Sequence, residues 1–394
     1  MRTIGIVVRG VRAPIIKAGD DLANIVVESL MEAQKEEGFK FRDKDIVAVT
    51  EAVVGKAEGN FVTVDDIAND IRIKYPSGEV GLVFPILSRN RFSICLKGIA
   101  RGVKKIYIQL SFPSDEVGNG ILDEDKFEKS KYNLSSVISE DEYTKNFGDF
   151  LHPFTGINMV DFYRELVKDE NCDVEFVFSN DPKTILDYTK DILVCDIHTR
   201  DKTKKLLSNA STNVYGLCDI MSEAIGDSGF NPMYGLLGSN KSTEEKLKLF
   251  PKTGDVLVKN IHDKLYELTG KNIEVMVYGD GAFKDPVGKI WELADPVVSP
   301  AYTDGLEGTP NELKLKYISD NKFKDLSGEE LVMAMKKEIA EKDKNLKGKM
   351  ETQGTTPRRL TDLIGSLCDL TSGSGDKGTP IVFIQGYFDN YADE

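Results

Sequence analysis

The residue with the clearest chemical signal is Asp280, which lies between Gly279 and Gly281. It follows residues 273–277, in which alternating β-branched residues predict a buried strand. Glycine lets the backbone turn sharply and approach a bound group closely. A carboxylate at the C-terminal end of a strand is therefore typical of a magnesium–nucleotide site. The alternative is a turn aspartate that hydrogen-bonds its own backbone.

Two further polar segments could contact a nucleotide or its metal ion. Lys56 lies in a glycine-bounded turn, where a compact ammonium group can contact a phosphate. Most lysines in turns are simply solvated, which is the alternative. Asp115, Glu116 and Asn119 follow a strand-like run and carry oxygens that suit Mg²⁺ or Mn²⁺. A polar loop at a strand exit commonly has the same composition without a metal.

A loop rich in glycine and serine, at residues 373–378, offers backbone N–H groups and hydroxyls to an anion. It is not a P-loop, because the sequence GxxxxGK[ST] is absent. By composition alone, a plain connecting turn is the better interpretation.

The composition indicates a globular protein with two domains, or one domain with an insertion. The 394 residues exceed the size at which a single core usually stops growing. The formal charge of −14 argues against a nucleic-acid surface, which needs clustered Lys and Arg. The three histidines lack a zinc-binding pattern and the five cysteines lack CxxC spacing, so we expect reduced thiols and no zinc site.

The N-terminus predicts neither a secretory signal nor a membrane span, since it has one positive charge and a short apolar run before Arg9. We therefore expect a cytoplasmic protein. Strands and helices in mixed order predict an α+β fold with mixed sheets and packed helices. The expected strands are residues 3–8, 45–50, 80–84, 105–110, 173–178, 192–197, 273–277 and 380–385, and the expected helices include 254–269, 328–342 and 355–370.

Four segments resemble, in the same order, the family of coenzyme F420-0:L-glutamate ligases (γ-glutamyl ligases). Residues 14–22 (PIIKAGDDL) are similar to the family's PLIKxGDDL, and residues 54–59 (VGKAEG) to VSKAEG. Residues 269–280 resemble TGKxxxxITD, and residues 363–386 resemble the helix, loop and strand that end in GxPVVxxRG. The four segments lie at both ends of the chain.

The resemblance implies a nucleotide-dependent ligase with a γ-glutamyl ligase-like fold and an intertwined homodimer. In that family GTP activates the acceptor carboxylate as an acyl phosphate, L-glutamate displaces the phosphate, and two divalent cations, Mg²⁺ or Mn²⁺, bridge nucleotide and protein. Position by position, Asp280 takes the place of a metal ligand, and we assign Asp280 and Lys56 to catalysis. The positions expected to contact the nucleotide are Ala13, Pro14, Ile15, Ile16, Glu51, Lys56, Gly373, Ser374, Gly375 and Asp376.

The chain departs from the family pattern at the expected metal site. Gly281 stands where the family has Thr, and Ser374 aligns with a Gln that binds metal, which has a longer reach. The family's segment NAGxDxSN has no clean counterpart, because residues 97–100 (KGIA) keep only the Gly-Ile pair. We expect Asp115 and Glu116 to supply the missing metal ligands.

The chain is about 140 residues longer than a typical member of that family. We therefore place an insertion or second subdomain at 125–255, between ligase-like parts at 1–124 and 256–394. The expected function is an ATP- or GTP-dependent γ-glutamyl ligase whose acceptor is F420-0 or a folate. Two alternatives stay open: coupling of another amine to another acid, and a nucleotide- or metabolite-binding protein with altered catalysis.

Overall fold

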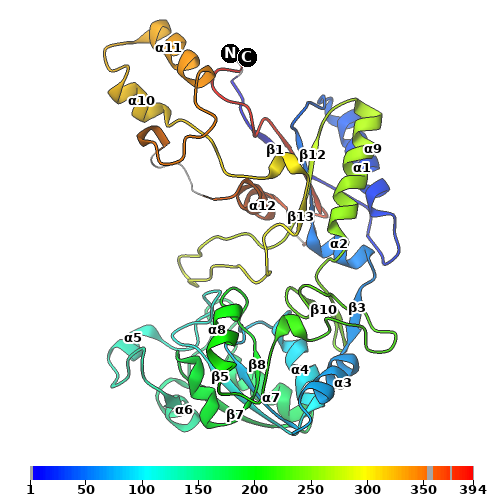
Figure 1. Cartoon of the computed structure of the whole chain (residues 1–394), viewed down its shortest axis with the longest axis vertical. Helices are drawn as coiled ribbons and strands as arrows, with labels where there is room; N and C mark the ends of the chain where they lie inside the picture. Colours follow the sequence, from blue (N-terminus) through cyan, green and yellow to red (C-terminus); the bar gives the residue numbers. More distant parts are fainter. Residues whose placement is uncertain (1–2, 353–357, 373–374, 394) are drawn as a thin grey trace.

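The computed structural model describes residues 3–352, 358–372 and 375–393. Its elements form two units, one above the other in Figure 1, which we call the five-stranded unit and the six-stranded unit after their sheets. A small three-stranded sheet connects them. The predicted α+β class, with mixed sheets and packed helices, is confirmed.

Both ends of the chain contribute to the five-stranded sheet, in the order β1-β14-β2-β12-β13. β14 pairs antiparallel with β1 and β2, and β12 pairs parallel with β2. The central strands are continuous apolar runs, as expected for strands covered on both faces. The strands are β1 (Val7–Val11), β2 (Ile46–Thr50), β12 (Glu274–Tyr278), β13 (Ala301–Tyr302) and β14 (Ile381–Gln385).

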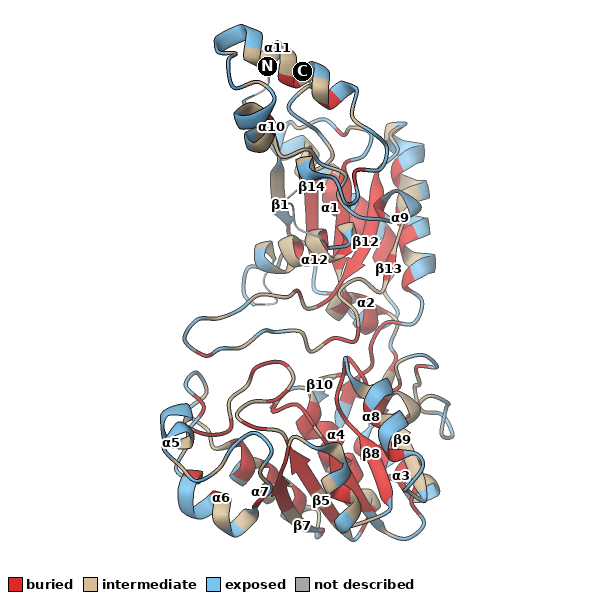
Figure 2. Cartoon of the chain, turned by 60° about the vertical axis from the view of Figure 1, so that its left-hand side comes forward, coloured by how far each residue is buried: buried red, intermediate tan, exposed pale blue. Residues whose placement is uncertain are grey.

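Helices cover the two faces of this sheet (Figure 2). Val47 faces α1 and α9 and shares a buried cluster with Leu30 and Ile261. Its neighbour Ile46 points the other way and packs with Ile364 of α12, because successive strand residues face opposite sides. The helices of this unit are α1 (Leu22–Glu37), α2 (Glu51–Ala57), α9 (Gly254–Thr269), α10 (Leu315–Asn321), α11 (Gly328–Ala340) and α12 (Leu360–Thr371).

The six-stranded sheet has the order β6-β7-β5-β4-β8-β9, and only β6 runs antiparallel to its neighbour. Its strands are β4 (Glu79–Val83), β5 (Lys105–Leu110), β6 (Ile138–Ser139), β7 (Asp173–Phe178), β8 (Asp191–Val194) and β9 (Asn213–Gly216). Its helices are α3 (Val64–Lys74), α4 (Phe92–Gly102), α5 (Glu124–Glu128), α6 (Glu140–Phe147), α7 (Met159–Asp169) and α8 (Arg200–Leu207). In parallel sheets, ligands bind outside the carboxyl ends of the strands.

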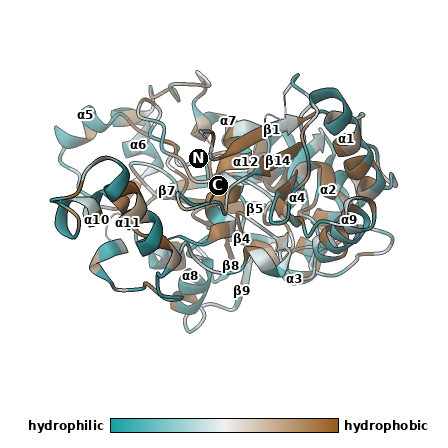
Figure 3. Ribbon diagram, turned by 90° about the horizontal axis from the view of Figure 1, so that it is seen from above, coloured by the Kyte–Doolittle hydropathy of each residue, from teal (hydrophilic) through white to brown (hydrophobic). Residues whose placement is uncertain are grey.

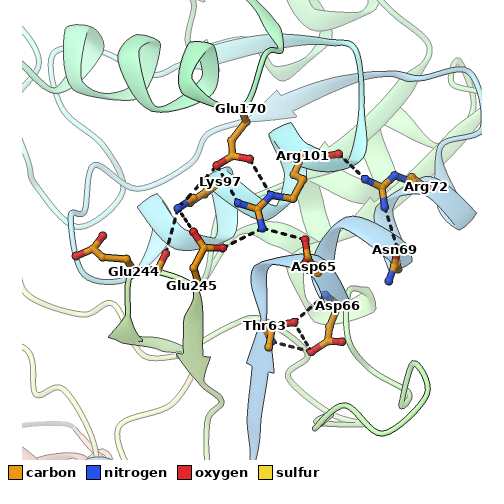
Figure 4. Close-up of polar contacts among 10 residues, drawn as sticks. All are labelled: Thr63, Asp65, Asp66, Asn69, Arg72, Lys97, Arg101, Glu170, Glu244 and Glu245. Carbon is orange, nitrogen blue, oxygen red and sulfur yellow. Dashed lines mark hydrogen bonds and ion pairs between the residues drawn. The ribbon is translucent and has the colours of Figure 1, made fainter.

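The chain enters and leaves the six-stranded unit through the small sheet of β3 (Phe61–Thr63), β10 (Asn240–Thr243) and β11 (Lys246–Lys248). Arg101 of α4 fastens this sheet to the unit (Figure 4). Its guanidinium donates to Glu170 at 2.8 and 3.1 Å and to Asp65 and Glu245 at 2.9 Å each. The β10–β11 turn, α3 and the end of α7 thus converge on one side chain.

The outer helices are more polar than the strands between them. Seen from above, hydrophobic ribbon gathers over the central elements, while outlying helices such as α5 are hydrophilic (Figure 3). α10 and α11 stand apart at the top of Figure 1, and their residues are mostly exposed or half-buried (Figure 2). No helix in the described ranges is long and apolar enough to cross a membrane.

Several boundaries differ from those expected from the sequence, among them the end of β8 at Val194 and the start of α12 at Leu360. The first strand is Val7–Val11 rather than residues 3–8, because its pairing register with Ile381–Gln385 places it there. The six-stranded sheet begins at Glu79, ahead of the expected boundary at residue 125, because β4 and β5 pair with β8 and β7. The expected three-part division of the chain stays a prediction.

Candidate active site

A cavity of about 1080 Å³ lies between the two units and is lined by residues of both. The six-stranded unit contributes the connection from β4 to α4 and the loop before α7. The residues expected to contact nucleotide or metal that line the cavity are Ala13, Pro14, Ile15, Ile16, Glu51, Lys56, Asp280 and Gly375. The structure therefore brings these segments together, while their contact with a nucleotide stays a prediction.

Asp280 lies two residues after β12, where close packing excludes a side chain from both neighbouring positions. A Cβ atom at Gly279 would lie 2.2 Å from Oδ2 of Asp295. A Cβ atom at Gly281 would lie 2.7 Å from the Cα of Ser366 in α12. Position 281 therefore has no room for the threonine of the family pattern, and only its backbone is available to a ligand.

The Asp280 carboxylate pairs with Arg91, which lies in the connection from β4 to α4. Nη2 of Arg91 donates to Oδ2 of Asp280 at 2.7 Å, and Nη1 donates to Oδ1 of Asp295 at 2.6 Å. The other oxygen of Asp295 accepts from the backbone N–H of Asp280 at 2.9 Å. Burial, followed by the charge of Asp295, raises the pKa of Asp280 well above its ordinary value, although Arg91 opposes this.

Glu51 begins α2 and forms a second buried pair beside this group. Its side chain is 5% exposed, and it accepts hydrogen bonds from Lys248 and, at 3.3 Å, from the amide of Asn240. Burial raises the pKa of Glu51, and the ammonium group of Lys248 lowers it. Glu51 is therefore held by β10 and β11, and Lys248 is committed to it. The side chain of Lys56, one turn later in α2, is exposed and makes no hydrogen bond or ion pair with the described part of the chain.

The group of side chains around Asp280 carries more negative than positive charge, although Lys56, Arg89 and Lys241 also line the cavity. Asp295, Glu51 and Asp369 all raise the pKa of Asp280, so four carboxylates interact electrostatically here. Arg91 and Lys248 are the two cationic side chains paired with them. Such an excess of carboxylates favours a bound cation.

The donors suit Mg²⁺ or Mn²⁺ in chemical type. Among the described residues, no group of three or more His, Cys, Asp or Glu side chains is arranged to hold a metal ion. Mg²⁺ is usually held by one or two carboxylates together with substrate phosphates, rather than by a cage of protein ligands. Asp280 and Asp369 both line the cavity. They therefore fit a cation that binds together with a nucleotide.

Asp115 and Glu116, the other expected metal ligands, do not line the cavity. Asp115 is buried, and its two oxygens accept from the backbone N–H groups of Leu87, Val117 and Asn119 at 2.7–3.1 Å. Glu116 accepts from the N–H groups of residues 197–199, just before α8, at 2.6–3.0 Å. Their carboxylates hold loops in this structure, and a metal role for them gains no support from it.

The glycine- and serine-rich loop is only partly described. Gly373 and Ser374 lie outside the described residues. Gly375 lines the cavity, whereas Asp376 is exposed and does not. The carbonyl of Gly378 accepts from the N–H of Ala13 at 3.3 Å. This contact joins the loop to the segment 13–16, the other expected nucleotide contact.

The sequence did not point to Arg91, Asp295 or Asp369. Arg91 follows a second arginine and an asparagine in the loop after a strand. A polar loop after a strand is the same kind of signal that led to the prediction for Asp115. Asp295 and Asp369 carry no local signal. Each becomes part of the site only because it contacts the backbone beside Asp280, Asp369 through the N–H of Gly281 at 3.0 Å.

The comparison with known families decides the affiliation of the chain. A family model described as F420-0:gamma-glutamyl ligase matches residues 10–386. The chain belongs to the F420-0:gamma-glutamyl ligase family. The resemblance predicted from the four segments is thereby confirmed.

A curated relative supports the same affiliation over a short segment. The chain is 37% identical over 65 residues to a coenzyme F420:L-glutamate ligase of Methanothermobacter thermautotrophicus. The match extends over 16% of this chain and 24% of that protein, so it covers about a quarter of the relative's length. Within the F420-0:gamma-glutamyl ligase family, this likeness is thus local.

Proposed function

We propose that the chain is a nucleotide-dependent γ-glutamyl ligase. It joins the amine of L-glutamate to a carboxylate of a cofactor-type acceptor, F420-0 or a folate, through an acyl phosphate. The observation that supports this proposal is the cavity, which Asp280, Lys56 and residues 13–16 line together. Membership of the F420-0:gamma-glutamyl ligase family supports the reaction class.

In the proposed reaction, an oxygen of the acceptor carboxylate attacks the γ-phosphorus of GTP or ATP, and the nucleoside diphosphate leaves. The glutamate amine then attacks the acyl carbon and loses a proton, and inorganic phosphate leaves. Lys56, whose ammonium group is free to do so, would bind phosphate oxygens. Asp280 and Asp369 would hold Mg²⁺ or Mn²⁺, which neutralises phosphate charge when bound.

The homodimer that the family resemblance implies belongs to the same proposal. The chain has a mass of 43.8 kDa. Light scattering should therefore give a particle of twice that mass. A particle of 43.8 kDa would remove the dimer from the proposal and leave the reaction standing.

The proposed reaction is tested by phosphate release from GTP and from ATP, with Mg²⁺ or Mn²⁺ present. L-Glutamate, F420-0 and a folate are added singly and in pairs, and mass spectrometry looks for an acceptor heavier by one glutamyl group. We expect phosphate release only when glutamate and one acceptor are both present. Phosphate release that does not require glutamate, but does require another amine, would favour coupling of that amine.

The second candidate is a nucleotide- or metabolite-binding protein with altered catalysis. Two observations favour it: position 281 cannot carry a hydroxyl side chain, and Arg91 occupies one oxygen of Asp280. Calorimetry that detects nucleotide binding, combined with no product from either acceptor, would support this candidate against the ligase.

A further inference from the structure

The loop before α7 places two unpaired polar groups in the cavity wall. His152 is 5% exposed, and neither of its ring nitrogens pairs with a protein group in the described part of the chain. The buried hydroxyl of Thr155 is likewise without a protein partner. Both residues line the cavity. The backbone holds them in place, because the N–H of His152 donates to Ile157 at 3.0 Å and its carbonyl accepts from Gly156 at 2.8 Å.

Unpaired buried polar groups weaken a fold, so a native structure that keeps two of them side by side calls for an explanation. Apolar groups of similar shape at these positions would avoid this loss of stability. A ligand that pairs with both groups would explain why they are present. Their position in the wall of the cavity gives such a ligand access to them.

A cationic side chain lies close enough to His152 to act on it electrostatically. Arg89 is exposed, lines the cavity and makes no side-chain hydrogen bond or ion pair among the described residues. It differs in this from Arg91, two residues later, which is fully engaged with Asp280 and Asp295. Burial, together with the charge of Arg89, holds the pKa of His152 below its ordinary value. The imidazole is therefore neutral at pH 7 and offers one donor and one acceptor.

We propose that Arg89, His152 and Thr155 form a subsite that binds an anionic group of the acceptor, a phosphate or a second carboxylate, remote from the carboxylate that reacts. A guanidinium with a hydroxyl and an imidazole N–H matches the oxygens of such an anionic group. This inference rests on the proposed function, since it concerns the second substrate of the same cavity.

The acceptor fits this subsite better than either other substrate. The segments expected to contact the nucleotide belong to the five-stranded unit, whereas this subsite belongs to the six-stranded unit. Phe154, Met159 and Ile86 line the cavity close to the subsite in the chain and in the fold. They offer apolar surface to a ring-bearing acceptor, whereas the short chain of glutamate has little apolar surface to place there.

The test uses Arg89→Gln in the full-length chain, because this exposed and unpaired side chain is not needed for folding. Arg358→Gln is the matched control, since Arg358 is exposed and does not line the cavity. Calorimetry measures binding of F420-0 and of a folate without nucleotide, and steady-state kinetics gives KM for each substrate. We expect R89Q to raise the acceptor Kd and KM by about tenfold, with KM for glutamate and GTP unchanged and R358Q like wild type.

A second variant separates binding from folding. His152→Phe removes two unpaired nitrogens from a buried position, so its melting temperature should equal or exceed that of wild type. Its acceptor Kd should nevertheless rise. Together, higher thermal stability and weaker acceptor binding are the signature of a binding residue rather than a structural one.

The outcomes distinguish this inference from the proposed function. Turnover by wild type with unchanged acceptor Kd and KM in R89Q would overturn the subsite and leave the ligase standing. A rise confined to the KM of glutamate would also overturn it, because the carboxylate bound there would be that of glutamate. Acceptor binding that R89Q weakens, without turnover in wild type, would support the subsite and count against the ligase. A wild-type chain that binds neither acceptor would overturn the subsite.

Discussion

Nη2 of Arg91 lies 2.7 Å from Oδ2 of Asp280, although 189 residues separate the two in the chain. Arg91 belongs to the six-stranded unit and Asp280 follows a strand of the five-stranded unit. The same guanidinium binds Asp295, whose side chain is 1% exposed. One side chain thus ties both units together at the wall of the cavity.

Asp280→Asn should abolish turnover while costing only about 1–2 kcal/mol of unfolding free energy. The amide keeps a hydrogen-bonding oxygen for Arg91, and Arg91 keeps Asp295, so the local packing survives. The negative charge for a metal ion is lost. Phosphate release and urea denaturation measure the two effects. Wild-type activity in this variant would remove Asp280 from the metal site.

Arg91→Met should destabilise the fold by about 3–5 kcal/mol, because Asp295 would be left as a buried charge without a cationic partner. Arg89→Met, two residues away, is the matched control, and it should change the unfolding free energy by no more than about 0.5 kcal/mol. Chemical denaturation compares the two variants directly. Equal losses in both would mean that the contacts of Arg91 contribute nothing particular to stability.

Lys56→Ala should weaken GTP or ATP binding by about tenfold and leave stability within about 0.5 kcal/mol of wild type. The exposed side chain of Lys56 has no partner among the described residues, so we expect its replacement to affect a bound ligand rather than the fold. Lys248→Ala should instead lower the unfolding free energy by about 3–5 kcal/mol, because it leaves the buried Glu51 carboxylate without its cationic partner. Calorimetry and denaturation of both variants check this contrast. Unchanged nucleotide affinity in Lys56→Ala would end its assignment as a phosphate contact.

His152 should make stability depend on pH below its ordinary pKa of 6.5, since burial and Arg89 lower its pKa in the folded chain. The unfolded chain then binds more protons than the folded one, so the unfolding free energy falls as the pH drops from 6.5 through the folded pKa. Above pH 6.5 this contribution is constant. The difference in unfolding free energy between wild type and His152→Phe, measured from pH 5 to 8, should widen only on the acid side. A constant difference would mean that His152 titrates normally.

The sequence predicted the parts of the site that depend on local pattern. The apolar run that ends at Asp280 has the composition of a buried strand, and β12 is one. Asp280 could be singled out because glycines flank it. Close packing around Gly279 and Gly281 explains why both positions are glycine. In each case the residues on which the prediction rests lie within a few positions of each other in the sequence, or in an element with strong periodicity.

The remaining parts depend on tertiary contacts. The pairing of Arg91 with Asp280 requires the relative placement of two sheets, which no local pattern reveals. The acidic loop at Asp115 has a composition suitable for a metal, but backbone N–H groups take up its oxygens. The membership of β4 and β5 in the six-stranded sheet likewise depends on their pairing with β8 and β7, which are distant in the sequence.

The position of β14 has a consequence for synthesis. This strand lies between β1 and β2, yet it is the last of the described strands to leave the ribosome. All strands of the six-stranded sheet emerge before β12 and β14, so we expect that unit to fold during translation while β1 and β2 wait without their partner. A nascent chain that stops before Ile381 would carry one folded unit and two open strand edges, which makes it a substrate for chaperones or a seed for aggregation.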